Sequence, residues 1–304
     1  MAFKVFIDGE AGTTGLEIRE KLIGHKEIEL VSIDPARRKD MGAKTELLAA
    51  VDVAVLCLPD EAARETADVV ASLGDAGPRL LDASTAHRVA DGWTYGFPEL
   101  APGQAEAVAG ARRVSNPGCY ATGAIALLRP AIDANLIPAD FPLTINAVSG
   151  YSGGGRQMIE AYETHKAPLF EIYGLGLEHK HIPEIMRWSN LRARPIFVPS
   201  VGNFRQGMLV CAPLHLDALP AKPKGADFEA AFRAHYKGAR YVTVAPVDAS
   251  GRLDALALNQ TNALDLHVYV NEARRQALLV ARLDNLGKGA SGAAVQNLEL
   301  MLGA

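Results

Sequence analysis

The sequence predicts an α/β protein with a Rossmann-like, doubly wound domain and a second, α+β domain with a mostly antiparallel sheet. Three observations support this prediction. Apolar runs alternate with helix-like stretches over roughly the first 100 of the 304 residues. A glycine-rich turn follows the first of these runs. Beyond Asn116-Pro117-Gly118, longer and more alternating strands replace this rhythm.

The N-terminal part is expected to form parallel strands joined by helices. The candidate strands are Phe3–Ile7, Leu30–Ile33, Val51–Leu58 and Leu80–Asp82, and the candidate helices are Leu16–Ile23 and Glu61–Leu73. Val51–Leu58 is almost wholly apolar, as expected of a parallel strand that is covered on both faces. A doubly wound sheet binds its ligands beyond the carboxyl ends of its strands.

The C-terminal part is expected to contain a mostly antiparallel sheet. The candidate strands are Leu143–Val148, Ile196–Pro199, Met208–His215, Arg240–Val247 and Ala263–Asn271, and the candidate helices are Ala121–Ala134, Gln157–His165 and Phe228–Tyr236. The last segment, Lys288–Leu302, begins glycine-rich and continues as a helix. Such a pattern is typical of an α+β domain.

Composition disfavours nucleic-acid-binding, membrane-spanning and disulfide-rich secreted proteins. The chain is 49% hydrophobic and 22% charged, and its net charge is −4 with Lys and Arg scattered, which gives no case for a nucleic-acid or anionic-membrane partner. The N-terminus enters a strand rather than a signal sequence, and no apolar run approaches the roughly 18 residues of a membrane span. Three widely spaced cysteines favour a reduced, cytoplasmic setting over a disulfide framework.

The turn after the first strand has the spacing G-x-x-G-x-x-G, formed by Gly9, Gly12 and Gly15. Glycines allow the backbone to turn tightly and approach a pyrophosphate, which then sits on the positive N-terminus of the next helix. The hydroxyl groups of Thr13 and Thr14 are further candidate donors to a cofactor. A purely structural glycine turn is the alternative.

Asp34 and the arginines Arg37 and Arg38 stand at the end of the second strand. An acid there favours a free ribose 2′-hydroxyl, whereas nearby arginines favour a 2′-phosphate. The pair of arginines points to NADP(H), and solvated surface arginines are the alternative.

Cys119 is the candidate nucleophile. It follows Ser115-Asn116-Pro117-Gly118 and begins a helix-like run, where the helix dipole and unsatisfied N–H groups lower a thiol pKa that is normally about 8.5. A cysteine nucleophile requires such a depressed pKa. Cys57 and Cys211 lie within apolar strands and are expected to be buried small hydrophobes.

Two histidines, His179 and His181, precede Glu184 in the segment H-K-H-I-P-E. An imidazole beside a thiolate suits general acid–base chemistry, and the residues alone leave either histidine possible. A metal site is disfavoured because further ligands are missing. The segment Ser149–Arg156 is a second flexible loop, whose Arg156 suits an anionic substrate and whose glycines also suit a plain hairpin connection.

In combination these motifs resemble the N-acetyl-γ-glutamyl-phosphate reductases of arginine biosynthesis, specifically the shorter variety. The matching segments span nearly the whole chain in the expected order: the Gly9/Gly12/Gly15 turn, Asn116–Thr122, Ser149–Arg156, His179–Glu184 and Asp284–Ala290. The N-P-G-C-Y segment together with H-x-H-x-P-E is specific, whereas the glycine turn is not. The turn departs from the G-A-T-G start that is usual in longer members of the family.

The resemblance implies an activity and a domain organisation. The family reduces N-acetyl-γ-glutamyl phosphate with NADPH to N-acetylglutamate semialdehyde and phosphate, through a thioester on the residue that corresponds to Cys119. It implies an NADP-binding domain over residues 1–117, completed by the C-terminal helix at 286–304. A catalytic and dimerisation domain over residues 118–285 would mediate a homodimer or homotetramer.

The resemblance also implies roles for individual residues. His179 and His181 would supply the acid–base. The expected contacts with the substrate are Asn116, Arg88, Arg156, Arg205 and Glu184, and the expected contacts with the cofactor, besides the turn and the arginines, are Pro59, Ser84 and Asn285.

Two other functions compete with this one. Aspartate-semialdehyde dehydrogenase is similar in fold and chemistry, and substrate choice discriminates it. A non-catalytic NADP-binding module is the second, and it predicts an unreactive Cys119. Glyceraldehyde-phosphate dehydrogenase is disfavoured because its S-C-T-T-N type motif is absent.

Overall fold

The computed structural model describes residues 2–37, 40–247 and 250–304. By their contacts the residues form two compact units. Unit 1 comprises Met1–Pro98, Gly103–Pro117 and Ala290–Ala304, and unit 2 comprises Glu99–Pro102 and Gly118–Gly289. Arg38, one of the two arginines expected at the cofactor, lies outside the described residues.

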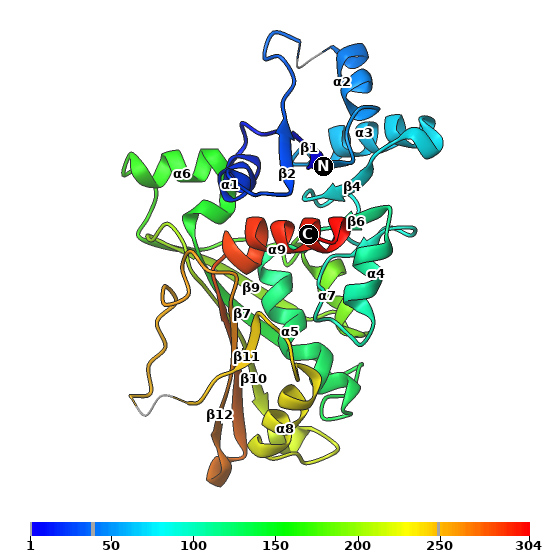
Figure 1. Ribbon diagram of the computed structural model, residues 1–304. Coiled ribbons are helices and arrows are strands. Elements are labelled where there is room, and N and C mark those ends of the chain that lie inside the picture. Colours follow the sequence, from blue (N-terminus) through cyan, green and yellow to red (C-terminus); the bar gives the residue numbers. More distant parts are fainter. Residues whose placement is uncertain (1, 38–39, 248–249) are drawn as a thin grey trace. The chain divides into compact units, whose positions relative to one another are not determined.

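Unit 1 is built on a parallel sheet of six strands in the order β2-β1-β3-β4-β6-β5 (Figure 1). The strands are β1 (Phe3–Asp8), β2 (Ile28–Val31), β3 (Val53–Leu56), β4 (Arg79–Asp82), β5 (Thr94–Tyr95) and β6 (Arg113–Ser115). The helices are α1 (Thr13–Leu22), α2 (Met41–Leu48), α3 (Asp60–Ser72), the short 3₁₀ turn Gly74–Ala76, α4 (Gln104–Gly110) and α9 (Gly292–Leu302).

Helices cover both faces of this sheet, as the sequence predicts. Along β1, Val5 and Ile7 join one apolar cluster and Phe6 joins another, because successive side chains of a strand point to opposite faces. The first cluster includes residues of α1 and α9, and the second includes residues of α2 and α3. Helix α9, at the end of the chain, therefore completes the core of unit 1.

Unit 2 is built on a seven-stranded mixed sheet in the order β11-β12-β13-β10-β7-β9-β8. The strands are β7 (Thr144–Gly150), β8 (Phe170–Ile172), β9 (Ile196–Gly202), β10 (Met208–His215), β11 (Val242–Val244), β12 (Leu264–Asn271) and β13 (Gln276–Leu283). Among the described strands of this second sheet, only the pairs β7–β9 and β11–β12 are parallel, so the sheet is mostly antiparallel, as predicted.

The helices of unit 2 are α5 (Cys119–Asp133), α6 (Gly155–Glu163), α7 (Ile182–Ser189) and α8 (Gly225–His235), with 3₁₀ turns at Tyr151–Gly154, Leu216–Ala218 and Glu272–Arg274 and a π-helical turn at Gly287–Ser291. Helix α5 packs on β10 and β13 and is buried almost along its whole length. Gly123 permits this contact, because a Cβ at that position would lie 2.7 Å from a methyl group of Val210. The most buried helix of the unit is therefore the one that begins at Cys119.

The structure differs from the sequence prediction in one central strand. Strand β13 pairs along its whole length with both β10 and β12, yet its pattern did not predict a strand. Leu279, Val280 and Ala281 are all buried, so the alternation that identifies a half-buried strand is lost there. The predicted strand Arg240–Val247 is shorter in the structure, where β11 covers Val242–Val244.

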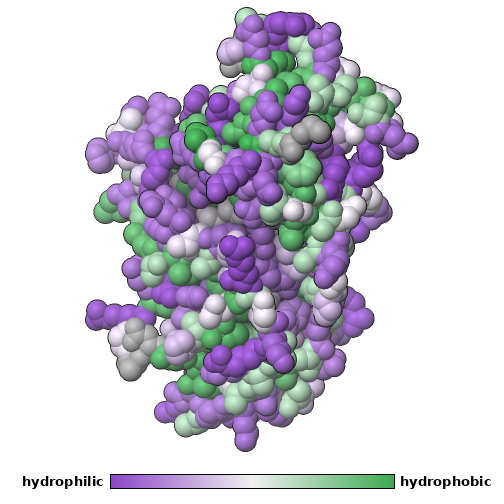
Figure 2. All heavy atoms as spheres, viewed as in Figure 1, coloured by the Kyte–Doolittle hydropathy of each residue, from purple (hydrophilic) through white to green (hydrophobic). Residues whose placement is uncertain are grey.

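The surface mixes polar and apolar side chains. In Figure 2, hydrophilic side chains cover much of the visible face and apolar ones are interspersed among them, which is ordinary for a folded protein. Within the described residues, every helix is too short or too polar to cross a membrane.

Candidate active site

The carboxyl edge of the unit 1 sheet gathers several residues that the sequence assigned to the cofactor or the substrate. Gly9 directly follows β1 and Asn116 directly follows β6. Ser84 lies two residues beyond β4, and Pro59 lies beyond β3 as the N-cap of α3. Parallel strands end at the same edge, so these positions meet where doubly wound sheets bind ligands.

The glycine turn has the geometry that a dinucleotide requires. Gly9 has a φ of +92°, and a Cβ there would lie 2.3 Å from the carbonyl oxygen of Cys57. A Cβ at Gly15 would lie 2.4 Å from the carbonyl oxygen of Gly9. Helix α1 begins directly after Gly12, so its N-terminal N–H groups face the turn. These residues fit a bound pyrophosphate.

A hollow of about 300 Å³ lies beyond β2 and is lined in part by Ser32, Asp34, Arg37 and Leu47. The guanidinium of Arg37 is 3.1 Å from the carboxylate of Asp40, and Asp34 accepts the backbone N–H of Ala36. The hollow combines apolar walls with two acids, Asp34 and Glu46, and one arginine, which fits the adenosine end of a dinucleotide. Thr13 and Thr14 are half-buried in the first turn of α1.

The loop after β4 is fixed by a buried carboxylate. Asp82 accepts the hydroxyl of Ser84 at 2.8 Å, and its Oδ2 lies 2.6 Å from Nδ1 of His87. The His87 ring stacks on Trp93 with centroids 4.0 Å apart. Ser84, expected at the cofactor, is thus held by Asp82.

Arg88 and Asn116 meet in unit 1. The Arg88 Nε donates to the carbonyl oxygen of Asn116 at 3.1 Å, and Nη2 donates to Ala83 at 3.4 Å. The Asn116 amide donates to the carbonyl of Ala290 and accepts from Asn297, both at 3.0 Å. Both residues are buried, so they shape the segment that leads into Cys119.

Cys119 is the first residue of α5, and Gly118 is its N-cap. Glu184, from α7, accepts the backbone N–H of Gly118 through Oε1 at 2.8 Å and is 1% exposed. Thr122 makes the first intrahelical bond, to Gly118, so the N–H groups of Tyr120 and Ala121 precede it. The thiol therefore stands at the positive end of a buried helix, which favours the thiolate.

Aromatic rings surround Tyr120, the residue that follows Cys119. The ring centroid of Tyr120 lies 5.9 Å from those of both His179 and His181, and the two imidazoles are 4.8 Å apart. Tyr173 places its hydroxyl 3.5 Å from Nε2 of His179. Burial raises the pKa of Tyr173 to about 12, and the nearby charge of the Cys119 sulfur adds to the shift. The structure thus brings both predicted histidines to the start of α5.

The two histidines differ in environment. Burial, with a smaller effect of Lys180, lowers the pKa of His179 to about 4. Nδ1 of His179 accepts the backbone N–H of His181 at 3.2 Å, which requires that nitrogen to be unprotonated. His181 is 4% exposed and occupies the N-cap position of α7. His179 is therefore neutral near pH 7 and braces the backbone of His181.

The other two cysteines, Cys57 and Cys211, are free thiols. Burial raises the pKa of Cys57 to about 12 and that of Cys211 to about 11, and Asp82 and Asp8 contribute at Cys57. Both side chains keep some solvent-accessible area and are half-buried. Neither thiol is ionised near neutral pH.

The remaining predicted residues of unit 2 lie around the loop after β7. The Asn285 amide accepts the N–H of Gly207 and donates to Ser152, both at 2.9 Å. Arg205 forms an exposed ion pair with Glu163 at 2.8 Å, and Arg156 is exposed in the first turn of α6. Asn285 thus joins two loops of unit 2. Across the described chain, no group of three or more His, Cys, Asp or Glu side chains is arranged to hold a metal ion.

Two family models match most of the chain. Residues 119–285 match the family model described as semialdehyde dehydrogenase, dimerisation domain, and residues 4–108 match the one described as semialdehyde dehydrogenase, NAD binding domain. An N-acetyl-gamma-glutamyl-phosphate reductase of a Chelativorans species is 53% identical, over 99% of both chains. N-acetyl-gamma-glutamyl-phosphate reductase 2 of Pseudomonas putida is 52% identical, over 99% of this chain and 97% of its own.

The chain belongs to the N-acetyl-γ-glutamyl-phosphate reductase family. Among solved structures, aspartate semialdehyde dehydrogenase II of Vibrio cholerae shares the fold, with a TM-score of 0.73 at 16% identity over 99% of both chains. An aspartate semialdehyde dehydrogenase with NADP from Candida albicans gives a TM-score of 0.65 at 15% identity, also over 99% of both chains. At such low identity these structures share only the fold with this member of the reductase family.

Sequence reasoning did not find three interactions of this reductase-family chain: the bond from Gly118 to Glu184, the contact between Asp82 and His87, and the ion pair between Lys288 and Glu99. The partners of the first lie 66 residues apart and those of the last 189. Of these three interactions, only the contact between Asp82 and His87 could have been suspected from the sequence, because its partners lie just five residues apart.

Proposed function

We propose that this protein reduces N-acetyl-γ-glutamyl phosphate with NADPH to N-acetylglutamate 5-semialdehyde and phosphate, a step of arginine biosynthesis. Unit 1 binds the dinucleotide through Gly9, Gly12 and the hollow beside Arg37, and unit 2 carries the nucleophile. The observation that carries the proposal is the placement of Cys119 at the start of the buried helix α5, with Glu184 holding the preceding N–H. Relatives at 52–53% identity that carry this name support the choice of substrate.

Cys119 is the residue that becomes acylated in the proposed reaction. Its thiolate attacks the carbonyl carbon of the acyl phosphate, a C–S bond forms, and the bond to the phosphate oxygen breaks. The N–H groups of Tyr120 and Ala121, which precede the first intrahelical bond, stabilise the oxyanion of each tetrahedral species. When bound, NADPH supplies the hydride that reduces the thioester. The thiohemiacetal on Cys119 then breaks down to aldehyde and thiolate.

We assign proton transfer to His181. It takes the proton that the Cys119 thiol loses and returns it to the sulfur after the thiohemiacetal oxyanion has collapsed to aldehyde and thiolate. His179 is the weaker candidate, because its pKa of about 4 keeps it unprotonated and its Nδ1 is engaged by the His181 backbone. His179 therefore acts as a brace for His181.

We retain Arg88, Arg156 and Arg205 as candidate anchors for the carboxylate and phosphate of the substrate. Arg156 and Arg205 have exposed guanidinium groups, which suits contact with an anion. Arg88 and Asn116 are buried and bonded to backbone, which suits positioning of the Cys119 segment. Alanine variants should separate these roles: loss of an anchor raises KM, whereas loss of a positioning residue lowers kcat.

The decisive assay is phosphate-dependent reduction of NADP by purified protein with N-acetylglutamate semialdehyde, run beside aspartate semialdehyde. We expect turnover with the first aldehyde only. Cys119→Ser should fold, bind NADP(H) and lose nearly all turnover, and trapping with substrate should acylate the wild-type peptide that contains Cys119. A Cys119→Ser enzyme that retains about a tenth of wild-type turnover would contradict the covalent route.

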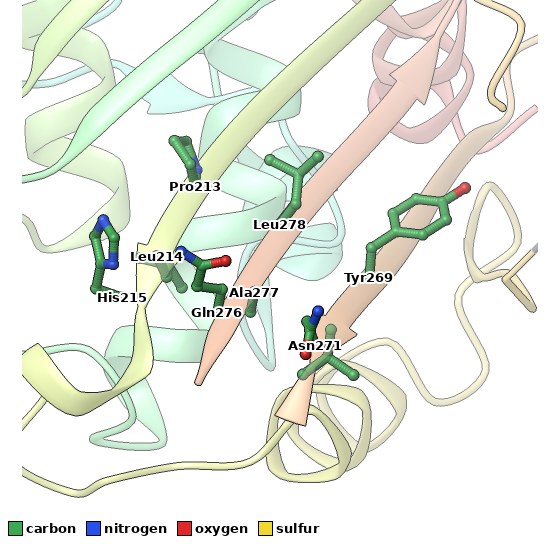
Figure 3. Close-up of a pocket in the computed structure, with 9 residues that line it drawn as sticks. Pro213, Leu214, His215, Tyr269, Asn271, Gln276, Ala277 and Leu278 are labelled. Carbon is green, nitrogen blue, oxygen red and sulfur yellow. The ribbon is translucent and has the colours of Figure 1, made fainter. Parts of the chain in front are cut away.

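We further propose that a second copy of this chain docks on one face of the unit 2 sheet. Met208, Val210, Ala212 and Leu214 of β10 are buried on the face that carries α5, so the alternate residues of β10 point to the opposite face. That opposite face holds hollows of about 430 and 390 Å³. In Figure 3, Pro213, Leu278 and Tyr269 stand on the same side of three neighbouring strands.

Apolar side chains on this sheet face remain exposed in a single chain: Phe170 by 57%, Ile172 by 48%, Ile196 by 53% and Leu278 by 37%. The dimerisation-domain model covers the whole sheet, which supports a second copy as the occupant. Ile172→Asp is expected to convert the oligomer, a dimer or tetramer, to monomers in analytical ultracentrifugation. An unchanged sedimentation coefficient would place the interface elsewhere.

We also propose a cytoplasmic location, because none of Cys57, Cys119 and Cys211 is part of a disulfide and the proposed chemistry needs a reduced sulfur. Cell fractionation of the source organism, with antibody detection, tests the location directly. Recovery with the membrane or secreted fraction would contradict it.

A further inference from the structure

Lys288 is a buried ammonium group that the proposed chemistry does not use. It lies in the π-helical turn Gly287–Ser291 and is 1% exposed. Its Nζ is 2.9 and 2.8 Å from the two carboxylate oxygens of Glu99, and 5.4 Å from the centroid of the Tyr241 ring. Lys288 and Glu99 thus form a desolvated ion pair inside unit 2.

Such a pair is a poor way to gain stability. Removing two charges from water costs about as much as their attraction returns, and an apolar pair of similar volume is often equally stable. Burial lowers the pKa of Lys288, and the Glu99 carboxylate opposes that shift. The pair therefore calls for a geometric role, and π-turns are frequent at functional sites.

The residue after Lys288 touches the nucleophile. A Cβ at Gly289 would lie 2.8 Å from Cβ of Cys119 and 3.3 Å from its Cα, so the Gly289 backbone is packed directly against that residue. The Gly289 N–H donates to the carbonyl of Asp284 at 3.0 Å. Lys288 therefore directly precedes the backbone segment that packs against Cys119, and its ion pair fixes the position of that segment.

The other half of the ion pair is itself held. Nε2 of His235, in α8, lies 3.3 Å from the carbonyl oxygen of Glu99. Glu99 belongs to the short segment Glu99–Pro102, which packs with unit 2 although its chain neighbours pack with unit 1. The ion pair therefore connects Lys288 to the segment Glu99–Pro102, which contacts α8 through His235.

We propose that the Lys288–Glu99 ion pair is a positioning device that holds Gly289 against Cys119 and so sets the orientation of the sulfur. The inference rests on Cys119 being the nucleophile. Lys288 and Glu99 act through the backbone and do not contact the substrate. Displacement of a reacting group by about 1 Å costs up to about a hundredfold in rate, so a small shift of Gly289 is measurable.

The test replaces the pair by an apolar pair of similar volume, Lys288→Met with Glu99→Met. We expect a folded enzyme with an unchanged KM, a kcat lowered about tenfold, and a rate of Cys119 alkylation by iodoacetamide lowered at least about threefold. The matched control is Arg129→Met with Asp133→Met, an ion pair of 2.6 Å at the far end of α5. The control should leave both rates unchanged.

A second variant guards against failure to fold. Glu99→Asp keeps the charge balance but withdraws the carboxylate by one methylene, and it should lower the rate of Cys119 alkylation in a protein with native circular dichroism. Wild-type values of the alkylation rate and of kcat in either folded variant would overturn the proposal. Alkylation by iodoacetamide does not depend on the identity of the substrate, so a wild-type enzyme that is inactive on N-acetylglutamate semialdehyde would refute the proposed function without affecting this test.

Discussion

Glu184→Ala should both destabilise the protein and slow its chemistry. The wild-type carboxylate accepts the N–H of Gly118 at 2.8 Å in a position that is 1% exposed. Alanine leaves that N–H without its acceptor and opens a small cavity. Loss of a hydrogen bond to a charged group costs about 1.5–3 kcal/mol, and the cavity adds about 1 kcal/mol. We therefore expect a loss of about 3 kcal/mol, or roughly a hundredfold in the unfolding equilibrium.

The assay for Glu184→Ala is urea unfolding followed by circular dichroism, with the iodoacetamide rate of Cys119 measured on the same sample. Glu184→Gln is the matched control, because it keeps the volume and an acceptor oxygen while it removes the charge, and it should cost about 1 kcal/mol. The rate at which Cys119 reacts with iodoacetamide should be highest in the wild type, lower in Glu184→Gln and lowest in Glu184→Ala. The reason is that the start of α5 is held less firmly in each successive protein. A Glu184→Ala protein within about 0.5 kcal/mol of wild type, or a Gln variant as impaired as Ala, would refute the reasoning.

Three further predictions concern the cofactor turn and the titrating groups. Gly9→Ala should abolish NADP(H) binding in a fluorescence titration, whereas Gly24→Ala, also at positive φ (+81°) but with open space around its Cβ, should bind normally; equal binding by both would contradict the turn assignment. The free energy of unfolding should fall as the pH drops from 6.5 toward 4, because the unfolded chain takes up a proton on His179 that the folded state resists; His179→Gln should make this fall shallower, and an unchanged slope would argue against the lowered pKa. At neutral pH iodoacetamide should label Cys119 long before Cys57, whose pKa is about 12, and peptide mass spectrometry that finds the reverse order would refute the assignment.

Much of the fold follows from local pattern. The apolar run around β3 predicts a strand covered on both faces, and apolar clusters on the two sides of β1 confirm the doubly wound arrangement. The mostly antiparallel second sheet is also confirmed. Strand β13 was not predicted, because Leu279, Val280 and Ala281 are all buried and their segment therefore lacks the alternation of apolar and polar residues that identifies a half-buried strand.

The sequence by itself determined the features that depend on neighbours along the chain. The spacing of Gly9, Gly12 and Gly15 predicts the turn, and the structure shows why a side chain is excluded at Gly9 and Gly15. The pattern of Ala121–Ala134 predicts a helix, which is confirmed as α5 and begins two residues earlier, at Cys119.

Only the tertiary structure decided what surrounds the sulfur. Glu184 reaches Gly118 across 66 residues, and Lys288 reaches Glu99 across 189. The two histidines became distinguishable because burial and Lys180 act on His179, while its Nδ1 accepts the His181 backbone. Periodicity and turn propensity are properties of short segments, whereas burial and long-range pairing exist only once the sheets and helices have packed.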